Sequence, residues 1–315
     1  MLEKDMKLLT VLAAATLLVL PASARPIQED STKVASQNPS PMTESTRKHA
    51  RIEQTQRAGT RFLIPDVLPK PASVFVPQRR AGSKSFDVLI HFHGAGYVTE
   101  NAAERSNGAI IGVTINLGSG SKAYNDAFRD STTFGVLLDS IRNGTERALG
   151  HRFIVRHTLL SGFSAGYGAI RRILSSQENY ARVDGVLLLD GIHTSYIPER
   201  RVLAEGGRID STGLLTFLRL ARDASGRSSH KKFLITHSEI FPGTFVSTTE
   251  STDFLLNNLS LHRTPVLRWG PLGMQQISSV RKGHFEIMGF AGNAGPDHVD
   301  HLQSLFWFLS RLRDL

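Results

Sequence analysis

The sequence predicts an α/β protein, in which a mostly parallel sheet has helices on both faces and no large lid. Between residues 60 and 315, apolar strand-like runs alternate with segments of helical spacing, as in sheets whose parallel strands are joined by helices. The run at 186–189 reads Val-Leu-Leu-Leu, which indicates a strand buried on both faces. The stretch at 162–166 joins an extended run to a helical one through a turn bounded by glycines.

The expected elements follow in chain order. Short β-rich runs bounded by turn residues indicate strands, and apolar residues three or four apart indicate helices. Strands are expected at 73–76, 86–92, 109–117, 153–160, 186–189, 233–236 and 266–269, and a hairpin at 277–280 and 284–290. Helices are expected at 134–149, 167–174, 214–221 and 249–259, and a last amphipathic helix carries Leu302, Leu305, Phe306, Leu309 and Leu312. The segment between 190 and 231 has room for one helix and loops, but not for a large lid.

The turn at 162–166 carries the candidate nucleophile. It reads Gly162-Phe163-Ser164-Ala165-Gly166, a Gly-x-Ser-x-Gly motif between a predicted strand and a predicted helix. A turn this tight strains the serine backbone and brings strand and helix together, which leaves no room for Cβ atoms at the two glycines. In this context the motif is typical of a nucleophile elbow, so Ser164 is the predicted nucleophile.

A second segment follows the predicted strand at 86–92 and reads His91-Phe92-His93-Gly94-Ala95-Gly96. Together with the serine turn it resembles the α/β-hydrolase family, whose esterases and lipases carry an HGGG-type loop after an early strand. The resemblance covers about residues 60–315, and Ala95 stands where that loop has its middle glycine. It implies an oxyanion hole formed by the backbone N–H of Ala165 with that of Ala95 or Gly96.

The resemblance also implies that the catalytic histidine follows Ser164, because the family order is serine, acid, histidine. The histidines in that part of the chain are His193, His230, His237, His262, His284, His298 and His301. The base should follow the last strand and precede the final helix, which leaves His284 and His298. A hairpin at 277–290 would put His284 at the edge far from the nucleophile. His298 follows Pro296 at a helix start and shares a helix face with Leu302. His298 is therefore the favoured catalytic base, and His284 stays its rival.

The acid of the triad should follow a late strand. Asp190 ends the apolar run at 186–189, where an unpaired buried carboxylate would be costly. Glu239 follows the strand at 233–236, which is where the family more often places its acid. Asp190 is the favoured partner of the catalytic histidine, and Glu239 stays the rival.

Loops at the carboxyl ends of parallel strands line the crevice where ligands bind. Residues 118–121 follow the strand at 109–117, so we expect Ser119, together with Tyr124, to shape the substrate pocket. His93 and Gly94 of the oxyanion segment are also expected to contact the substrate. The turn at 118–121 lacks the lysine spacing of a phosphate-binding loop.

Neither a metal nor another cofactor is expected. His91 and His93 share a strand face, but no carboxylate stands beside them to complete a metal site. A serine-histidine-acid triad works with side chains and backbone groups alone. The chain has no cysteine, which excludes disulfides, thiolate nucleophiles and cysteine-ligated zinc.

The amino-terminal residues predict export. Lys7 precedes a mostly apolar run at 8–20, and small residues Ala22 and Ala24 follow, as in a secretory signal peptide cleaved after Ala24. The run is short for a membrane span, which needs about 20 residues. Residues 25–58 are rich in Ser, Thr, Pro and Gln and predict a flexible linker. We therefore expect a signal peptide (1–24), a linker (25–58) and one α/β-hydrolase domain (59–315), without stable membrane insertion after cleavage.

The net charge of +9 favours anionic surfaces, but Lys and Arg are scattered and no basic tract with interleaved aromatics is present. A nucleic-acid partner is therefore not expected. The sequence predicts a secreted or periplasmic serine hydrolase of the esterase type, acting on a small-molecule or envelope ester. Acyl transfer on the same fold, and a hydrolase-like binding module without catalysis at the cell envelope, remain alternatives. The sequence predicts no oligomeric state.

Overall fold

The structure is a computed structural model that describes residues 51–78 and 82–315. The predicted signal peptide and most of the predicted linker lie outside the described residues, so the division at 24 and 58 stays a prediction. At the end of the linker range, the N–H of Ile52 donates to Gln303 Oε1 at 3.0 Å, and Arg57 pairs with Glu104 at 3.2 Å.

Among the described residues, ten strands form one sheet in the order β1-β2-β4-β3-β5-β6-β9-β12-β11-β10. The six strands β4, β3, β5, β6, β9 and β12 run parallel, and antiparallel pairs flank them on both sides. The strands are β1 (Gly59–Ile64), β2 (Ala72–Pro77), β3 (Ser85–Phe92), β4 (Ile110–Ile115), β5 (Ile154–Phe163), β6 (Gly185–Leu189), β9 (Lys232–His237), β10 (Thr264–Trp269), β11 (Gln275–Lys282) and β12 (Phe285–Phe290).

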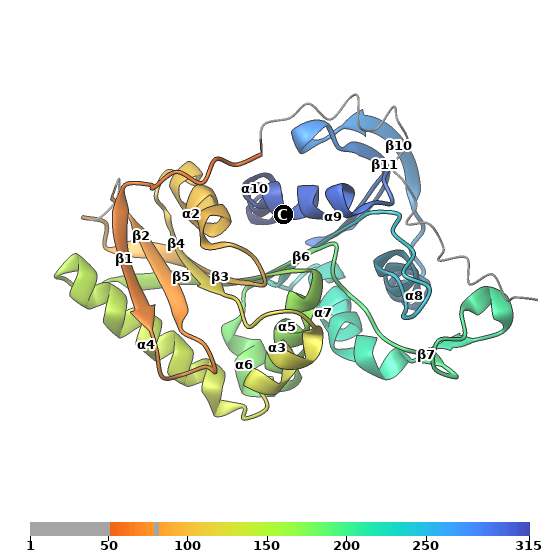
Figure 1. Cartoon of the computed structure of the whole chain (residues 1–315), viewed down its shortest axis with the longest axis horizontal. Helices are drawn as coiled ribbons and strands as arrows, with labels where there is room; N and C mark the ends of the chain where they lie inside the picture. Colours follow the sequence, from red (N-terminus) through yellow and green to blue (C-terminus); the bar gives the residue numbers. More distant parts are fainter. Residues whose placement is uncertain (1–50, 79–81) are drawn as a thin grey trace, which may run out of the picture. The chain divides into compact units, whose positions relative to one another are not determined.

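Helices cover both faces of this sheet, as Figure 1 shows. They are α2 (Gly96–Arg105), α3 (Ser121–Ala127), α4 (Thr132–Leu149), α5 (Tyr167–Ser175), α6 (Gln177–Arg182), α7 (Leu215–Ser225), α8 (Thr248–Leu259), α9 (Gly295–Gln303) and α10 (Leu305–Arg313). The predicted α/β class with a mostly parallel sheet is thereby confirmed. None of the helices in the described ranges is long and apolar enough to cross a membrane.

The alternation of side chains along β3 produces two cores, one on each face of the sheet. Val88, Ile90 and Phe92 pack into the larger core under α4, α5, α7 and α8. Leu89 points the other way, into a core shared with α2 and α10. Strands buried on both faces explain why the parallel strands read as apolar runs in the sequence.

Several elements were not predicted. β1, α2, α3 and α6 are additional, and the final helix is interrupted, since Ser304 ends α9 and begins α10. The segment between Asp190 and Lys231 contains α7 and a small separate sheet of β7 (Tyr196–Ile197) and β8 (Arg208–Ile209). β1 is an edge strand in which exposed and partly buried residues are mixed, so it lacks the continuous apolar pattern of the central strands.

Candidate active site

Ser164 lies on a sharp kink between β5 and α5. Its φ is +46°, in the left-handed region that a non-glycine residue rarely adopts. A Cβ on Gly166 would come within 2.2 Å of the Phe92 carbonyl oxygen, and a Cβ on Gly162 within 3.0 Å of the Gly166 backbone. Gly166 is therefore required for the close approach of the turn to β3, and Gly162 packs tightly against the start of α5. The serine side chain is partly exposed at the carboxyl end of the sheet.

Asp190 and His298 form a hydrogen-bonded pair at the same end of the sheet. Asp190 directly follows β6, and His298 lies in the first turn of α9, after Pro296. The His298 Nδ1–H donates to Asp190 Oδ2 at 2.7 Å. The Asp190 carboxylate is only 5% exposed, whereas the His298 side chain is 26% exposed. An ionised carboxylate can only accept, so this bond fixes the proton on Nδ1 and leaves Nε2 as the free acceptor.

The loop that carries the acid lies directly against the serine. A Cβ on Gly191 would approach the Ser164 backbone oxygen to 2.3 Å and its nitrogen to 2.6 Å, so only a glycine fits beside the kink. The His298 ring packs on the ring of Phe163, the residue before the serine, with centroids 4.4 Å apart. No direct hydrogen bond joins Ser164 to His298 among the described residues. Such bonds are often long without bound substrate.

Two hydrogen bonds from Ser238 hold the acid. The Ser238 N–H donates to Asp190 Oδ1 at 2.9 Å, and its hydroxyl donates to Oδ2 at 2.6 Å. Burial by itself would raise the pKa of Asp190, but the imidazoles of His301 and His298 and the bonds from His298 and Ser238 outweigh it. The pKa of Asp190 is therefore held well below its usual range. The carboxylate stays charged beside the imidazole.

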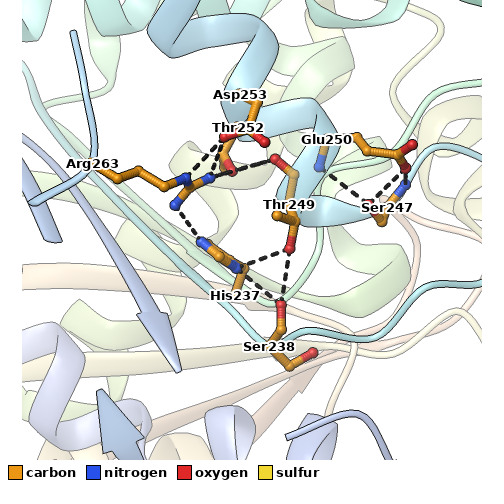
Figure 2. Close-up of polar contacts among 8 residues, drawn as sticks. All are labelled: His237, Ser238, Ser247, Thr249, Glu250, Thr252, Asp253 and Arg263. Atoms are coloured by element: carbon orange, nitrogen blue, oxygen red, sulfur yellow. Dashed lines mark hydrogen bonds and ion pairs between the residues drawn. The ribbon is translucent and has the colours of Figure 1, made fainter. Parts of the chain in front are cut away.

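A further network, which Figure 2 shows, extends from Ser238 to α8 and Arg263. Arg263 Nη1 donates to His237 Nε2 at 2.7 Å, so His237 carries its proton on Nδ1 and donates it to the Ser238 carbonyl at 2.9 Å. The Thr249 hydroxyl donates to the same carbonyl at 3.1 Å, and Asp253 pairs with Arg263 at 2.8 Å. Burial, followed by the Arg263 charge, lowers the pKa of His237 to about 4. The sequence did not single out these residues, although Ser238 follows β9 at the carboxyl edge of the sheet.

The segment predicted for the oxyanion hole lies beside the elbow. Gly96 begins α2, and Ala95 precedes it with extended φ and ψ of −83° and 142°. His93 has a φ of +69°, and its ring stacks on that of Phe163 with centroids 5.8 Å apart. The Ala165 N–H belongs to the short helical turn after the serine. Two chain segments with backbone N–H groups thus meet at the end of β3 and β5.

The two rival residues make other contacts. His284 lies in the turn of the β11–β12 hairpin, before β12 at the opposite end of the sheet, and its Nδ1 contacts the carbonyl of Leu315. Glu239 is exposed, and its carboxylate accepts the N–H of Gly292 at 3.2 Å. Neither residue contacts the Asp190–His298 pair through a hydrogen bond among the described residues.

An open pocket of about 790 Å³ begins at Ser164 and Ala165. The residues that line it are Gly120, Ser121, Asn125, Ser164, Ala165, Tyr167, Arg171, His193, Thr194, Ser195, Asp210, Thr212, Gly213 and Phe245. The turn at 118–121 thus reaches the pocket through Gly120 and Ser121. His193 and Phe245 come from loops after β6 and β9, whose path no local sequence pattern encodes.

The four residues expected to contact substrate do not line this pocket. Ser119 is exposed, and His93 Nδ1 lies 2.9 Å from the hydroxyl of the buried Tyr124. That hydroxyl also accepts the Leu117 N–H at 3.1 Å, so Tyr124 holds the loop after β4 in place. Gly94 packs against the ring of His91, whose Nδ1 lies 3.1 Å from the Ser161 hydroxyl. Within the described ranges, no group of three or more His, Cys, Asp or Glu could hold a metal ion.

Comparison with family models and with curated proteins finds no match. Solved structures similar to this chain include an arylesterase (12% identity, TM-score 0.43, 87% of this chain and 90% of that chain). A ferulic acid esterase has 14% identity and a TM-score of 0.48 over 80% of this chain and 96% of that chain. An acetyl xylan esterase from Aspergillus awamori has 13% identity and a TM-score of 0.44 over 79% of this chain and 100% of that chain.

The activities in those names belong to those proteins. The fold of this chain follows from its own topology. Antiparallel strands β1 and β2 precede the parallel strands in the order β4-β3-β5-β6-β9-β12, and a Gly-x-Ser-x-Gly kink follows β5. The chain has an α/β-hydrolase fold, the fold that its sequence predicts.

Proposed function

We propose that the chain is an exported serine hydrolase that cleaves an ester through an acyl-enzyme, with Ser164, His298 and Asp190 as its triad. One observation carries the proposal: a serine on a strained kink lies against the loop whose buried carboxylate accepts the Nδ1–H of His298 at 2.7 Å. This is the arrangement in which an otherwise weak serine nucleophile gains a positioned base.

In the acylation step, His298 Nε2 removes the proton of the Ser164 hydroxyl while Oγ bonds to the ester carbonyl carbon. The carbonyl oxygen becomes an oxyanion, which the N–H of Ala165 and that of Ala95 or Gly96 would stabilise. When the intermediate collapses, the bond to the alcohol oxygen breaks and His298 returns the proton to the leaving alcohol. Asp190 stays ionised and stabilises the imidazolium that forms in between.

In the deacylation step, a water molecule replaces the alcohol. His298 takes one proton from the water as its oxygen bonds to the acyl carbon, and then returns it to Ser164 Oγ as the acid product leaves. Acyl transfer differs only in the acceptor, because another alcohol can take the place of water. We assign water as the acceptor of the acyl group, because the pocket is open at the serine.

Pre-steady-state hydrolysis of 4-nitrophenyl acetate tests the proposal. A burst of nitrophenol equal to the enzyme concentration is expected, because this activated ester should acylate the serine faster than water frees the acid. Ser164→Ala should lose both the burst and the steady state, while circular dichroism shows it folded. A folded wild-type protein that turns over no ester would instead support the non-catalytic binding module. Transfer of the acetyl group to added alcohols, without free acetate, would assign acyl transfer.

We also propose that residues 1–24 direct export and are removed. The basis is the sequence pattern of Lys7, the apolar run at 8–20 and the small residues Ala22 and Ala24. Amino-terminal sequencing of protein recovered from the periplasm or the medium should begin at Arg25. Recovery of the uncleaved chain from the membrane fraction would overturn this part of the proposal.

A further inference from the structure

One arginine, Arg171, lines the pocket beside Ser164. It belongs to α5, the helix that follows the turn of the nucleophile. Its guanidinium carbon lies 5.5 Å from the centre of the Tyr167 ring, one helical turn closer to the serine. One guanidinium nitrogen lies against Gly213, where an added Cβ would approach it to 3.1 Å. The aromatic ring and the glycine thus hold the guanidinium inside the pocket.

Arg171 has no anionic partner in the part of the chain that the structure describes. Neither an ion pair nor a side-chain hydrogen bond joins it to another described residue, although it is partly buried. By contrast, its neighbour Arg172 lies outside the pocket and donates to the Arg129 carbonyl at 3.0 Å. A guanidinium offers five donors in a fork that matches a carboxylate. In the pocket, those donors are available to a ligand.

The other charged residue of the pocket, Asp210, is engaged in structure. Its Oδ1 accepts the Thr212 N–H at 3.0 Å and the Thr212 hydroxyl at 2.6 Å, which caps a helical turn. Two donors on one oxygen reduce the negative potential that this carboxylate presents to the pocket. Asp210 therefore weakens the attraction between Arg171 and an anion, but it forms no ion pair with the Arg171 guanidinium.

We infer that the substrate carries a carboxylate a few bonds from the scissile ester and that Arg171 binds it. The inference rests on the proposed function, because it concerns the same pocket. Ser164 and Arg171 both line this pocket, and their separation of seven residues corresponds to a rise of roughly 10 Å along a helix. A half-ester of a short dicarboxylic acid spans such a distance when its ester carbonyl lies at Ser164.

The test compares kcat/KM for the half-ester 4-nitrophenyl hydrogen adipate with that for the neutral 4-nitrophenyl heptanoate. Arg171→Gln should lower this ratio by about 10- to 100-fold, the range expected for hydrogen bonds to a charged group. Arg171→Glu should reverse the preference toward 4-nitrophenyl 6-aminohexanoate, whose chain ends in a cation. Arg172→Gln is the matched control and should leave the ratio unchanged. Asp210→Asn, which can still cap the turn, should raise the ratio.

Calorimetric binding of adipate to Ser164→Ala protein separates this inference from the proposed function. Adipate should bind, and the Arg171→Gln change should remove the binding. If no ester is cleaved but adipate binds through Arg171, the proposed function fails and the carboxylate site stands. If esters are cleaved with the same ratio in wild type, Arg171→Gln and Arg171→Glu, the inference is overturned while the hydrolase stands. Adipate binding that persists in Arg171→Gln overturns it as well.

Discussion

Two buried aspartates of this chain each bond to a histidine, at opposite ends of the same sheet. At the carboxyl end, Asp190 accepts the Nδ1–H of His298 at 2.7 Å and two bonds from Ser238. At the amino end, Asp87 in β3 lies 2.9 Å from Nδ1 of His157. The two pairs have similar hydrogen-bond lengths, but their surroundings differ.

Arginines neutralise the pair at the amino end. Asp87 bonds to Arg156 at 3.1 Å and to Arg313 at 3.2 Å, and the His157 side chain is 60% exposed. Around Asp190 the close donors are an amide, a hydroxyl and one imidazole, so no guanidinium neutralises its charge and His298 is the only imidazole hydrogen-bonded to it among the described residues. An Asp–His pair is therefore suited to catalysis when no guanidinium shares the carboxylate and a nucleophile lies beside it.

The largest expected contrast is between the two histidines. His298→Ala should lower kcat at least about 10⁴-fold, since removal of a triad base has effects of that size. His157→Ala should leave kcat unchanged, because its ring lies at the far end of the sheet. Steady-state hydrolysis of 4-nitrophenyl acetate measures both. Loss of turnover in His284→Ala, with His298→Ala active, would show that the base was assigned to the wrong residue.

Substitution of the two aspartates should affect different properties, kcat for Asp190 and stability for Asp87. Asp190→Asn should lower kcat about 10⁴-fold, because the amide favours the wrong imidazole tautomer. Asp87→Asn should keep kcat but lose about 1–3 kcal/mol of unfolding free energy, since Arg156 and Arg313 lose their partner. Urea denaturation and steady-state kinetics on both variants separate the effects. Glu239→Gln serves as control, and a larger loss of kcat there than in Asp190→Asn would favour the rival acid.

Acid should destabilise the carboxyl-end region through its buried histidines. The pKa of His237 is about 4 in the folded protein, against an ordinary value of 6.5, so the unfolded chain binds the proton first as pH falls. Stability should therefore decrease as pH falls from about 6.5 to about 4, by on the order of 3 kcal/mol. The folded-state pKa of Asp190 is lowered, so its protonation reduces the stability further only when the pH falls below 3.8, the pKa of an ordinary aspartate. Urea midpoints that stay constant from pH 7 to pH 4.5 would contradict this reading.

The smallest expected effect concerns Arg263, which acts through His237 and Ser238. Its charged hydrogen bond is worth about 1.5 kcal/mol, so Arg263→Gln should lower kcat about tenfold through looser positioning of Asp190. KM should stay unchanged, because Arg263 does not line the pocket, and Arg263→Lys should restore part of kcat. A rise in KM with kcat unchanged would assign Arg263 a role in binding.

The sequence predicted most of the central sheet because its strands are buried on both faces and appear as continuous apolar runs. β1, which is partly exposed along its length, and α2, which begins in a glycine-rich segment, gave no such pattern. Ser304 interrupts the final helix although the apolar stripe continues through it, so periodicity alone merged α9 and α10.

Of the candidate site, the motif and the carboxyl-end rule located Ser164, Asp190 and His298, which the fold brings together. The pocket was harder to predict, because side chains such as His193 and Phe245 come from loops whose conformation depends on distant contacts. Tyr124 shows the same limit. It was expected to shape the substrate pocket, but its hydroxyl contacts Leu117 and His93 instead, and those contacts depend on the tertiary structure.

Peptide mapping after reaction with a fluorophosphonate tests whether Ser164 is the activated nucleophile. One adduct is expected, on Ser164, that forms more slowly in His298→Ala and is absent from folded Ser164→Ala protein. An adduct on a different residue, or a folded wild-type protein that stays unmodified, would contradict the assignment of Ser164 as an activated nucleophile.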